Sequence, residues 1–593
     1  MKPVVFEREV VCRASPAELW PRFADTERLN RHIGSAALEV TPLDDGALAR
    51  FVIATQIGSI KVRYAEEPFS WQHASFFSFK RTMESGLAAS LYVRYDLEPR
   101  DGATLVRARF EATPRYSFAR PIIRLLTRQN IERLVRFVKE TDRVIAEKAD
   151  VELLRSPCDR QALHHALREL DGTHDAPLVE KLTTFLETAP DMELVRVRPY
   201  ELADRWGAPR RAVLRLFLGA VRAGALSLEW AILCPSCRTG SQLLPSLAEL
   251  TAQGHCHACD LRFGLDLDRA VEAVFRPQKR IRAVDARPFC IGGPMLTPHV
   301  VAQAPLPAGG AAELRVPDEP GRYRVFARGG ATAVVDVEPQ GRASAEIKVL
   351  GSGLAPLQLS LSPGATIHVV GDDAPRHVKL ERRDWSFPVA TAHQVSLLPE
   401  FRSHFGKEAL RPELALSVGR VAILFSDLCN STALYSRVGD AVAFGVVTDC
   451  LRFGSAIVER HRGLVVKTMG DAIMGAFEQP GDAVAAASAM LNEWEQLTRE
   501  QPHARALDLK IGVAVGTCMV MSANGMLDYF GQTVNRAARF QDLAGARQLV
   551  VPAELWAASG PRELTILESF STPVKGIDAP LDLVRATPIA PRS

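Results

Sequence analysis

The segment Gly463–Phe477, GLVVKTMGDAIMGAF, constrains the fold of this chain more than any other stretch. Two short runs rich in valine, isoleucine and methionine flank Met469-Gly470-Asp471, which is the pattern of a β-hairpin whose tight turn carries a carboxylate. Lys467 lies just before the turn. The sequence therefore predicts a hairpin with an acid at its tip and a base on its arm, an arrangement suited to phosphate and metal binding.

A second carboxylate lies upstream, at the end of another predicted strand. The apolar run Val421–Ser426 leads directly to Asp427, and the segment Leu428–Thr432 then turns toward a helix. Two carboxylates on neighbouring strands are the minimum that two divalent cations need in order to activate an attacking oxygen and neutralise a leaving group. Backbone N–H groups at the start of the helix can bind a triphosphate.

These motifs together resemble the catalytic domain of class III adenylyl and guanylyl cyclases. The resemblance rests on Phe425–Thr432 (FSDLCNST), Val466–Asp471 (VKTMGD), Leu527–Arg539 (LDYFGQTVNRAAR) and Val574–Gly576 (VKG). It implies a ferredoxin-like α+β domain over residues 415–593, which is less than a third of the chain. The remainder of the chain needs a prediction of its own.

The resemblance also implies a role for each matching residue. The roles are metal binding for Asp427, Leu428 and Asp471; triphosphate binding for Asn430, Ser431, Thr432 and Lys575; base reading for Lys467 and Asp528; ribose orientation for Asn535; and stabilisation of charge on the α-phosphate for Arg539. Two Mg²⁺ or Mn²⁺ ions per site are implied. Asn430 stands where the family commonly has glycine, and we expect it to adopt the same left-handed backbone conformation. Ala514 stands where a histidine is frequent.

Base choice follows from hydrogen-bond polarity. Adenine presents an acceptor at N1 and donors at N6, so a donating Lys467 and an accepting Asp528 match it, whereas guanine presents the opposite pattern. The prediction is therefore an adenylyl cyclase that converts ATP to 3′,5′-cyclic AMP and pyrophosphate. A guanylyl cyclase and a catalytically silent regulator that senses a ligand or contacts DNA remain the alternatives.

The family's division of labour predicts the assembly. In the family the metal aspartates come from one protomer, and the base-reading, ribose and arginine positions come from the other. This chain holds both halves once. We therefore expect a head-to-tail homodimer with two equivalent sites.

Length and composition place the chain among ordinary multidomain proteins. Its 593 residues predict three or four domains. Lysine and arginine total 72 against 69 acidic residues, so no global basic field favours a nucleic acid partner. We find neither an apolar signal core nor an apolar run long enough to span a bilayer, and we expect a cytoplasmic protein.

Residues 1–150 predict a ligand-binding domain. A strand, a helix start at Ser15-Pro16-Ala17-Glu18, several alternating segments and a long helix over residues 118–148 follow one another. This order resembles the START-like, helix-grip (SRPBCC-type) superfamily, in which a curved sheet wraps the last helix around an apolar cavity. The resemblance implies a hydrophobic small-molecule ligand, and a spacer with a filled core is the alternative. We expect the basic residues of the long helix to form a solvated face rather than a membrane-binding one.

Residues 151–285 predict a helical, winged-helix-like region. Helices at residues 200–207 and 209–223, followed by a strand at residues 225–232, give the order of a winged helix-turn-helix. Three arginines open the second helix, namely Arg210, Arg211 and Arg215. Because such folds also dock proteins and nothing else in the region is basic, we expect no nucleic acid partner.

Two C-x-x-C knuckles follow, formed by Cys234, Cys237, Cys256 and Cys259. Their spacing fits a four-thiolate zinc site, and because the protein fills all four positions the zinc would be structural. Redox chemistry would need only one pair. This block resembles the uncharacterised domains that precede cyclase domains in some bacterial proteins.

The chain between the knuckles and the C-terminal domain predicts two further parts. Residues 286–388 contain short alternating segments, at 323–327, 333–337, 345–350 and 366–370, which indicate a small β-sandwich. Residues 389–414 form a connector with apolar residues at helical spacing, through which a signal from upstream would pass. The chain as a whole is predicted to be a multidomain α+β protein.

Overall fold

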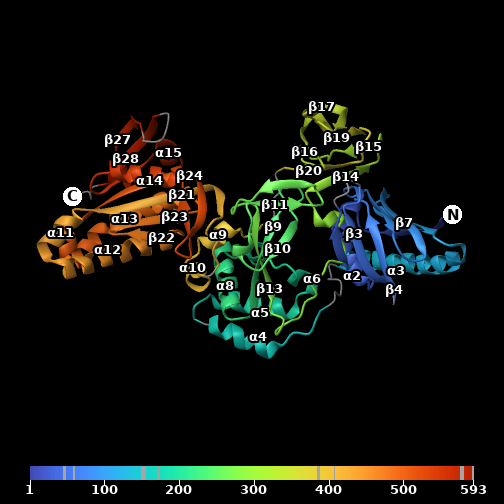
Figure 1. Cartoon of the computed structure of the whole chain (residues 1–593), viewed down its shortest axis with the longest axis horizontal. Coiled ribbons are helices and arrows are strands. Elements are labelled where there is room, and N and C mark those ends of the chain that lie inside the picture. Colours follow the sequence, from blue (N-terminus) through green and yellow to red (C-terminus); the bar gives the residue numbers. More distant parts are fainter. Residues whose placement is uncertain are drawn as a thin grey trace.

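The computed structural model describes residues 1–43, 48–57, 60–147, 155–170, 172–383, 388–406, 408–573 and 580–589. The protein is elongated (Figure 1). Its N-terminal and C-terminal domains occupy opposite ends of the long axis, residues 155–285 lie between them, and the strands within residues 300–382 stand above the N-terminal domain in this view.

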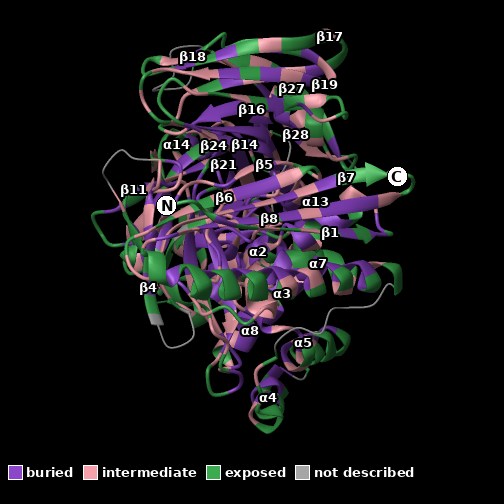
Figure 2. Ribbon diagram, turned by 90° about the vertical axis from the view of Figure 1, so that its right-hand side faces the viewer, coloured by how far each residue is buried: buried purple, intermediate pink, exposed green. Residues whose placement is uncertain are grey.

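The N-terminal domain is a curved antiparallel sheet packed on one long helix. Its elements are β1 (Val4–Cys12), α1 (Pro16–Phe23), α2 (Thr26–His32), β2 (Glu39–Pro42), β3 (Phe51–Ile57), β4 (Ile60–Glu66), β5 (Ser70–Gln72), β6 (Phe76–Met83), β7 (Ala88–Arg100), β8 (Ala103–Pro114), η1 (Ser117–Ala119) and α3 (Arg120–Glu147). Ser15 and Glu18 form the capping box that the sequence predicts at the start of α1. Figure 2, which views the molecule from this end, shows β6, β7 and β8 lying across α2 and α3.

Helix α3 confirms the long helix predicted over residues 118–148. It buries Ile131, Leu134, Phe137 and Val138 in the core of the domain. The relation to the START-like superfamily stays a prediction.

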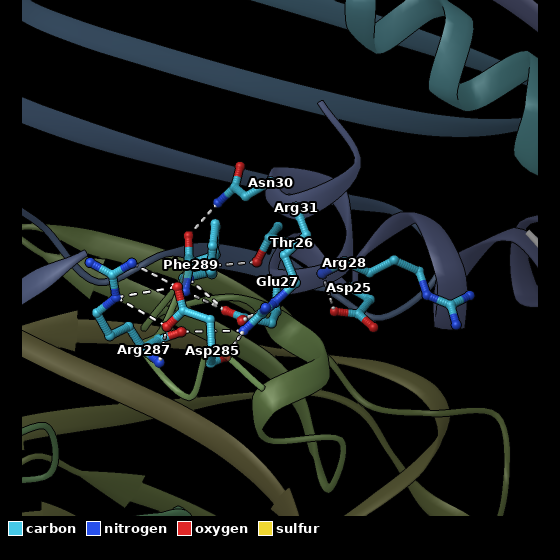
Figure 3. A network of polar contacts seen from close by, with 10 residues as sticks. Asp25, Thr26, Glu27, Arg28, Asn30, Arg31, Asp285, Arg287 and Phe289 are labelled. Atoms are coloured by element: carbon cyan, nitrogen blue, oxygen red, sulfur yellow. Dashed lines mark hydrogen bonds and ion pairs between the residues drawn. The ribbon is translucent and has the colours of Figure 1, made fainter. Parts of the chain in front are cut away.

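Helix α2 binds residues 285–290, the segment that follows the middle region of the chain, residues 155–285 (Figure 3). The Glu27 carboxylate accepts hydrogen bonds from the backbone N–H groups of Phe289 and Cys290, at 2.8 and 2.7 Å. Asn30 Nδ2 donates to the carbonyl of Phe289 at 2.6 Å, and the Arg31 guanidinium lies 4.2 Å from the centroid of the Phe289 ring. The N-terminal domain is therefore tied to chain more than 250 positions away by charged side chains as well as by packing.

The middle region contains the helices and strands predicted for a winged helix. Its elements are α4 (Arg160–Leu167), η2 (Arg168–Leu170), α5 (Ala176–Thr188), α6 (Asp191–Leu194), α7 (Pro199–Trp206), α8 (Arg210–Arg222), β9 (Leu226–Leu233), β10 (Gly240–Leu244), η3 (Leu247–Glu249), β11 (Gln253–Cys256), β12 (Leu261–Gly264) and β13 (Val271–Pro277). Gly207 ends α7 in the left-handed conformation, at φ +63°, which closes the turn before α8.

The arginines at the start of α8 contact protein. Arg210 pairs with Asp204 at 2.8 Å, Arg211 donates to the carbonyl of Arg462 in the C-terminal domain at 3.1 Å, and Arg215 pairs with Glu400. Arg211 and Arg215 therefore face the connector and the C-terminal domain, so these two contacts do not support a nucleic acid surface on α8.

The β-rich region is built of strands as predicted, and its sandwich arrangement stays a prediction. It consists of η4 (Pro294–Leu296), β14 (Val300–Leu306), β15 (Ala311–Arg315), β16 (Gly321–Ala327), β17 (Thr332–Leu350), β18 (Gly353–Ala355), β19 (Gln358–Gly371) and β20 (Arg376–Arg382). The segments predicted at 333–337 and 345–350 are one strand, β17, because its parallel pairing with β19 shifts register after Val337 and then resumes. Its strands enclose a core of their own, and because β14 also pairs with β5 they are hydrogen-bonded to the sheet of the N-terminal domain.

The connector is two short helices rather than one helical stretch. They are α9 (Ala392–Ser396) and α10 (Pro399–His404). Pro399 explains the break, because proline has no N–H to donate and pushes Leu398 into an extended conformation.

The C-terminal domain carries the sheet order expected of a ferredoxin-like fold. Its elements are β21 (Ala415–Cys429), α11 (Ser431–Val438), α12 (Asp440–Arg460), β22 (Leu464–Met469), β23 (Ala472–Phe477), α13 (Pro480–Glu500), η5 (Pro502–Ala506), β24 (Asp508–Ala523), β25 (Met526–Phe530), α14 (Gln532–Leu543), β26 (Gln548–Pro552), α15 (Ala553–Ser559), β27 (Leu564–Thr572) and β28 (Leu581–Pro588). The strands run β22-β23-β21-β24 and continue through β26, β28 and β27.

The central strand β21 is buried on both faces. Ala422 and Leu424 pack with α12 and α13, whereas Ile423 and Phe425 pack on the side of α14. This burial on both sides explains why the run before Asp427 reads as continuously apolar.

Helix α12 has the length and composition of a membrane span, with a mean hydropathy of 1.6 over 18 residues. The sequence prediction that no such run exists missed it. One face of α12, including Val446, Val447, Ile457 and Val458, is buried in the core of the C-terminal domain. The helix is therefore accounted for as a core helix.

Candidate active site

The hairpin turn presents Asp471 at its tip. Met469 pairs with Ala472, so the turn consists of Gly470 and Asp471. Gly470 has a φ of +66°, and glycine in the first central position suits a type II′ hairpin turn. The predicted hairpin, with its acid in the turn, is confirmed.

Asp427 lies beside that turn. The pairing of β21 with β23 extends as far as Ser426, so Asp427 follows at the strand end next to the loop that carries Asp471. Across the other edge of β21, Lys510 Nζ lies 2.8 Å from Asp427 Oδ2, and Gln541 Nε2 donates to the same oxygen at 3.5 Å. Although burial opposes its charge, the hydrogen bond to Asp427 helps to raise the pKa of Lys510 above its ordinary value.

Asp427 and Asp471 both contribute to the pKa of the Cys429 thiol. Burial is the largest cause that raises the pKa of this thiol; Lys510 opposes the rise, and the carboxylates of Asp508, Asp427 and Asp471 add to it. The strand register agrees, because Ser426 pairs with Ile473 and so places Asp427 and Asp471 at the same end of the sheet.

This locus fits a divalent cation. It offers the carboxylates of Asp427 and Asp471 and the single ammonium of Lys510. Carboxylate oxygens are the ligands that Mg²⁺ and Mn²⁺ prefer. The backbone of Leu428, whose side chain is buried, lies between the aspartate strand end and the following turn.

A helix starts directly after the aspartate strand. Asn430 adopts φ +66° and ψ +16°, the left-handed conformation expected of it, and is the N-cap of α11. Ser431 and Thr432 form the first turn of α11. The backbone N–H groups of this turn are free of intrahelical partners, as at any helix start, and suit an anionic ligand.

The two residues predicted to read the base, Lys467 and Asp528, contact each other directly. Lys467 on β22 and Asp528 on β25 form an ion pair, with Nζ 2.7 Å from Oδ2. The other oxygen of Asp528 accepts from the backbone N–H of Tyr529 at 2.8 Å, which orients the carboxylate. The side chain of Asp528 is 12% exposed and that of Lys467 is 35% exposed, so the pair is open at the lysine side.

The connector holds the strands behind this pair. The Arg402 guanidinium, on α10, donates to the carbonyls of Val465 and Val466 on β22 and to the carbonyl of Leu527 on β25. One side chain thus bridges the strand just before Lys467 and the residue just before Asp528. Burial lowers the pKa of Arg402, and the nearby Asp528 partly offsets that effect.

A second contact joins the connector to the same strand. The Tyr529 hydroxyl lies 3.3 Å from His393 Nδ1, and both side chains are buried. Burial lowers the pKa of His393 to about 4, so this imidazole is neutral near pH 7.

Asn535 and Arg539 lie on the surface of α14, the helix that also carries Gln541. Both are exposed, and at a spacing of four residues they share one helix face. Arg539 Nη1 lies 3.3 Å from Asp542 Oδ2. Lys575 lies outside the described residues.

The four knuckle cysteines converge. Cys234, Cys237, Cys256 and Cys259 are buried, and their sulfur atoms all lie within 4.8 Å of one another. The sulfurs of Cys237 and Cys256 are 3.7 Å apart, close to the separation of about 3.8 Å expected between thiolates around tetrahedral Zn²⁺. Lys379 Nζ donates to the sulfur of Cys259 at 3.3 Å. Four soft ligands and no open position fit a structural zinc ion.

A cavity of about 270 Å³ lies in the N-terminal domain between the sheet, α2 and α3. Its lining combines aromatic and aliphatic side chains with Asn30, Arg81 and Arg133. Phe289 and Cys290, from the segment bound by α2, complete the wall. The segment shown in Figure 3 therefore contacts both the cavity and the middle region.

Two polar residues of the site escaped the sequence prediction. Lys510 was detectable in principle, because β24 pairs with β21 and places it opposite Asp427. Arg402 belongs to no motif, and its position behind β22 and β25 depends on how the connector docks.

Comparison with family models assigns two parts of the chain. Residues 415–578 match the adenylate and guanylate cyclase catalytic domain. Residues 158–289 match a family of unknown function (DUF5939).

Curated relatives match about a quarter to a third of this chain. An uncharacterized protein of Mycobacterium tuberculosis is 33% identical over 165 residues, which are 26% of this chain and 38% of the relative. The adenylate cyclase of Lachancea kluyveri is 33% identical over 166 residues, or 24% of this chain and 9% of the relative. The putative adenylate cyclase 3 of Rhizobium meliloti is 28% identical over 178 residues, or 30% and 29%.

Among solved structures, the adenylyl cyclase CyaB from P. aeruginosa matches with 22% identity and a TM-score of 0.26, over 29% of this chain and 96% of that one. The chain spans less than two fifths of the length of each curated relative named above. The family match and these relatives identify a class III adenylyl/guanylyl cyclase catalytic domain at the C-terminal end of this chain.

Proposed function

We propose that the protein is an adenylyl cyclase that converts ATP to 3′,5′-cyclic AMP and pyrophosphate. The observation that carries the choice of ATP is the pair formed by Lys467 and Asp528. Each side chain now satisfies the other, and an adenine edge, with its acceptor at N1 and donors at N6, would satisfy both in turn. A guanine edge would leave a donor facing a donor, a buried mismatch that costs on the order of 10⁴ in discrimination.

The remaining residues perform the transfer. Asp427 and Asp471 would hold two divalent cations, which lower the pKa of the attacking ribose 3′-hydroxyl and neutralise the leaving pyrophosphate. The N-terminal turn of α11 binds the phosphates through its backbone N–H groups. Lys510 has to give up its hydrogen bond with Asp427 when a cation binds, and Gln541 keeps the carboxylate oriented.

The proposal includes a head-to-tail homodimer. Asn535 and Arg539 are exposed on one face of α14, where a second chain can reach them. A second copy would bring its ribose- and phosphate-binding face to the aspartates of the first.

The direct test is product formation by the purified protein with ATP or GTP, each with Mg²⁺ or Mn²⁺. We expect cyclic AMP to be the dominant product. Dominant cyclic GMP would contradict the choice of ATP, and absence of both products would favour a catalytically silent regulator.

Mixing variants tests the dimer. Asp427→Ala and Asn535→Ala proteins are each expected to be inactive, and an equimolar mixture should regain about a quarter of wild-type activity, because half of the molecules are heterodimers with one intact site each. An inactive mixture would count against a shared site.

The cavity of the N-terminal domain supports a second proposal, which is ligand sensing. Its aromatic lining and its few polar groups suit a mostly apolar small molecule. Phe289 and Cys290 form part of the cavity wall, so a bound ligand would displace the segment that connects this domain to the middle region. Filling the cavity with Val93→Phe should alter cyclase rate without altering the ATP-to-GTP ratio, and an unchanged rate would argue for a spacer.

The knuckles complete the proposal with a structural zinc ion bound by four thiolates. Elemental analysis of the purified protein should find one zinc per chain, and Cys256→Ser should lose it. A cytoplasmic location is proposed because ATP is available there and reduced thiols persist.

A further inference from the structure

The N-terminal end of the molecule exposes a row of large apolar side chains. The exposed fractions are 48% for Tyr116, 67% for Phe118, 45% for Ile122, 56% for Leu125 and 40% for Leu126; these five residues form the apolar stripe. No other stretch of this length among the described residues exposes as many large apolar side chains. The stripe therefore needs an explanation.

Helix geometry separates the stripe from the core. At 3.6 residues per turn, Phe118, Ile122, Leu125 and Leu126 fall within an arc of about 100°. The buried face at this end of α3 is different: Ala119 and Ile123 pack against β1 and β8. The start of α3 is thus apolar on an inner face, which is covered, and on an outer face, which is not.

Cationic side chains lie on one side of the stripe. Residues 112–131 include Arg115, Arg120, Arg124 and Arg128 and contain no acidic residue. Arg120 donates to the carbonyl of Lys2 at 2.8 Å, which brings the basic N-terminus to the same place. Arg124 and Arg128 are exposed, and neither forms an ion pair within the part of the chain that the structure describes.

The stripe also occupies an extremity of the protein. Val4 pairs with Ala112, so the start of α3 lies next to the N-terminus, which Figure 1 places at the end of the long axis opposite the C-terminal domain. A planar surface can approach this end without touching the candidate active site.

We propose that the apolar stripe and the adjacent arginines dock the protein on the surface of an anionic lipid membrane. An apolar row bordered by cations is the composition of an interfacial helix, in which the apolar side chains enter the headgroup boundary and the cations meet lipid phosphates. A second copy of the chain fits less well, because two stripes packed together would bring eight arginines from residues 112–131 near one another with no carboxylate from those segments between them. This docking revises the expectation of a plain solvated face.

The test is co-sedimentation of the full chain with vesicles of phosphatidylcholine alone or with about one third phosphatidylserine. We expect binding only to the anionic vesicles, and weaker binding at high salt, because screening shortens the reach of the surface potential. Arg124→Gln with Arg128→Gln should reduce partitioning about 30-fold, which corresponds to about 1 kcal/mol for each cation.

Matched variants separate docking from loss of fold. Phe118→Ser with Leu125→Ser should reduce partitioning about tenfold or more. Phe444, on α12 at the other end, is 67% exposed, like Phe118, so Phe444→Ser is the control that should leave vesicle binding unchanged. Far-ultraviolet circular dichroism of each variant should match the wild type.

Three results would overturn the proposal. The first is that the full chain does not bind anionic vesicles. The second is that the folded Phe118→Ser, Leu125→Ser variant binds them as well as the wild type. The third is that the wild type does not bind vesicles and that this variant changes from dimer to monomer. The last result would assign the stripe to a second copy.

Discussion

The two halves of the candidate active site are held by different parts of the chain. Asp427 and Asp471 are positioned by strands of the C-terminal domain, and the polar partners described for Asp427, Lys510 and Gln541, belong to that domain. Lys467 and Asp528 are supported from outside it, by Arg402 of the connector. The metal half is therefore self-contained, whereas the base-reading half depends on how the connector is docked.

The connector in turn belongs to the middle region. Arg215 on α8 pairs with Glu400, the Trp230 ring lies 6.0 Å from that of Phe401, and the Trp230 indole donates to Glu408 at 3.2 Å. A movement of α8 or β9 would therefore reach Arg402, and through it Lys467 and Asp528, by these direct contacts. A displacement of the connector would therefore reach Lys467 and Asp528 more directly than Asp427 and Asp471.

The largest effect is expected in the metal half. Asp471→Asn keeps the shape of the turn residue but removes a charge from the cation site, and should reduce cyclic AMP formation about a thousandfold. Binding of a fluorescent ATP analogue in the absence of metal should persist, because the base-reading pair is intact. Loss of both properties would mean that the two halves are not separable.

Arg402→Ala should damage the other half. Three carbonyls on β22 and β25 lose their donor, so the spacing between Lys467 and Asp528 relaxes. We expect the KM for ATP to rise about tenfold and the ATP-to-GTP ratio of kcat/KM to fall by a similar factor, with an unchanged Mg²⁺ requirement.

Arg402→Lys is the matched control for that variant. It keeps a cation but cannot reach both strands as a fork, so partial recovery of the ratio is expected. A uniform loss of kcat in both variants, at constant KM and ratio, would show that Arg402 serves stability alone.

Removal of zinc should raise the KM for ATP as Arg402→Ala does, but by a smaller factor. The knuckles pack on β20, where Glu381 accepts from Ser236 at 2.9 Å, and they follow directly from β9, which carries Trp230. Chelation is expected to lower the melting temperature by several degrees and to raise the KM for ATP a few-fold, and added Zn²⁺ should reverse both. A change in Mg²⁺ dependence instead would contradict the conclusion that the metal half of the site does not depend on the middle region.

The smallest effect concerns His393 and pH. Burial lowers the pKa of His393 to about 4 from an unfolded value of about 6.5, so the folded state resists protonation that the unfolded state accepts. Its contribution to stability is fully present above about pH 6.5 and is lost as pH falls toward 4, by about 2 kcal/mol at pH 5. His393→Gln should therefore show a flatter dependence of melting temperature on pH between 6.5 and 5 than the wild type.

Local sequence was sufficient for the features that depend on neighbouring residues. The hairpin around Asp471, the left-handed Asn430 and the capping box at Ser15 all follow from short-range backbone chemistry, and the structure contains each of them. The four cysteines were also predictable, because two C-x-x-C turns have little else to bind together.

The sequence erred where distant pairing decides the outcome. Two predicted strands proved to be the single bent strand β17, and the β-rich region proved to share a sheet with the N-terminal domain, since edge strands pair with whatever lies beside them. The predicted helix of the connector ends before Pro399. The proline is visible in the sequence, but the prediction relied on the helical spacing of the apolar residues.

By itself, then, the sequence predicted the chemistry of the site: which carboxylates would hold the metal, which cation and acceptor would read the base, and which thiolates would bind zinc. Only the tertiary structure decided what supports them. Arg402 reaches the base-reading strands and Lys510 reaches Asp427 because separate segments pack together, and no local pattern encodes such a contact. The same holds for the apolar stripe, since its residues resemble any core-facing helix until the fold shows that nothing among the described residues covers them.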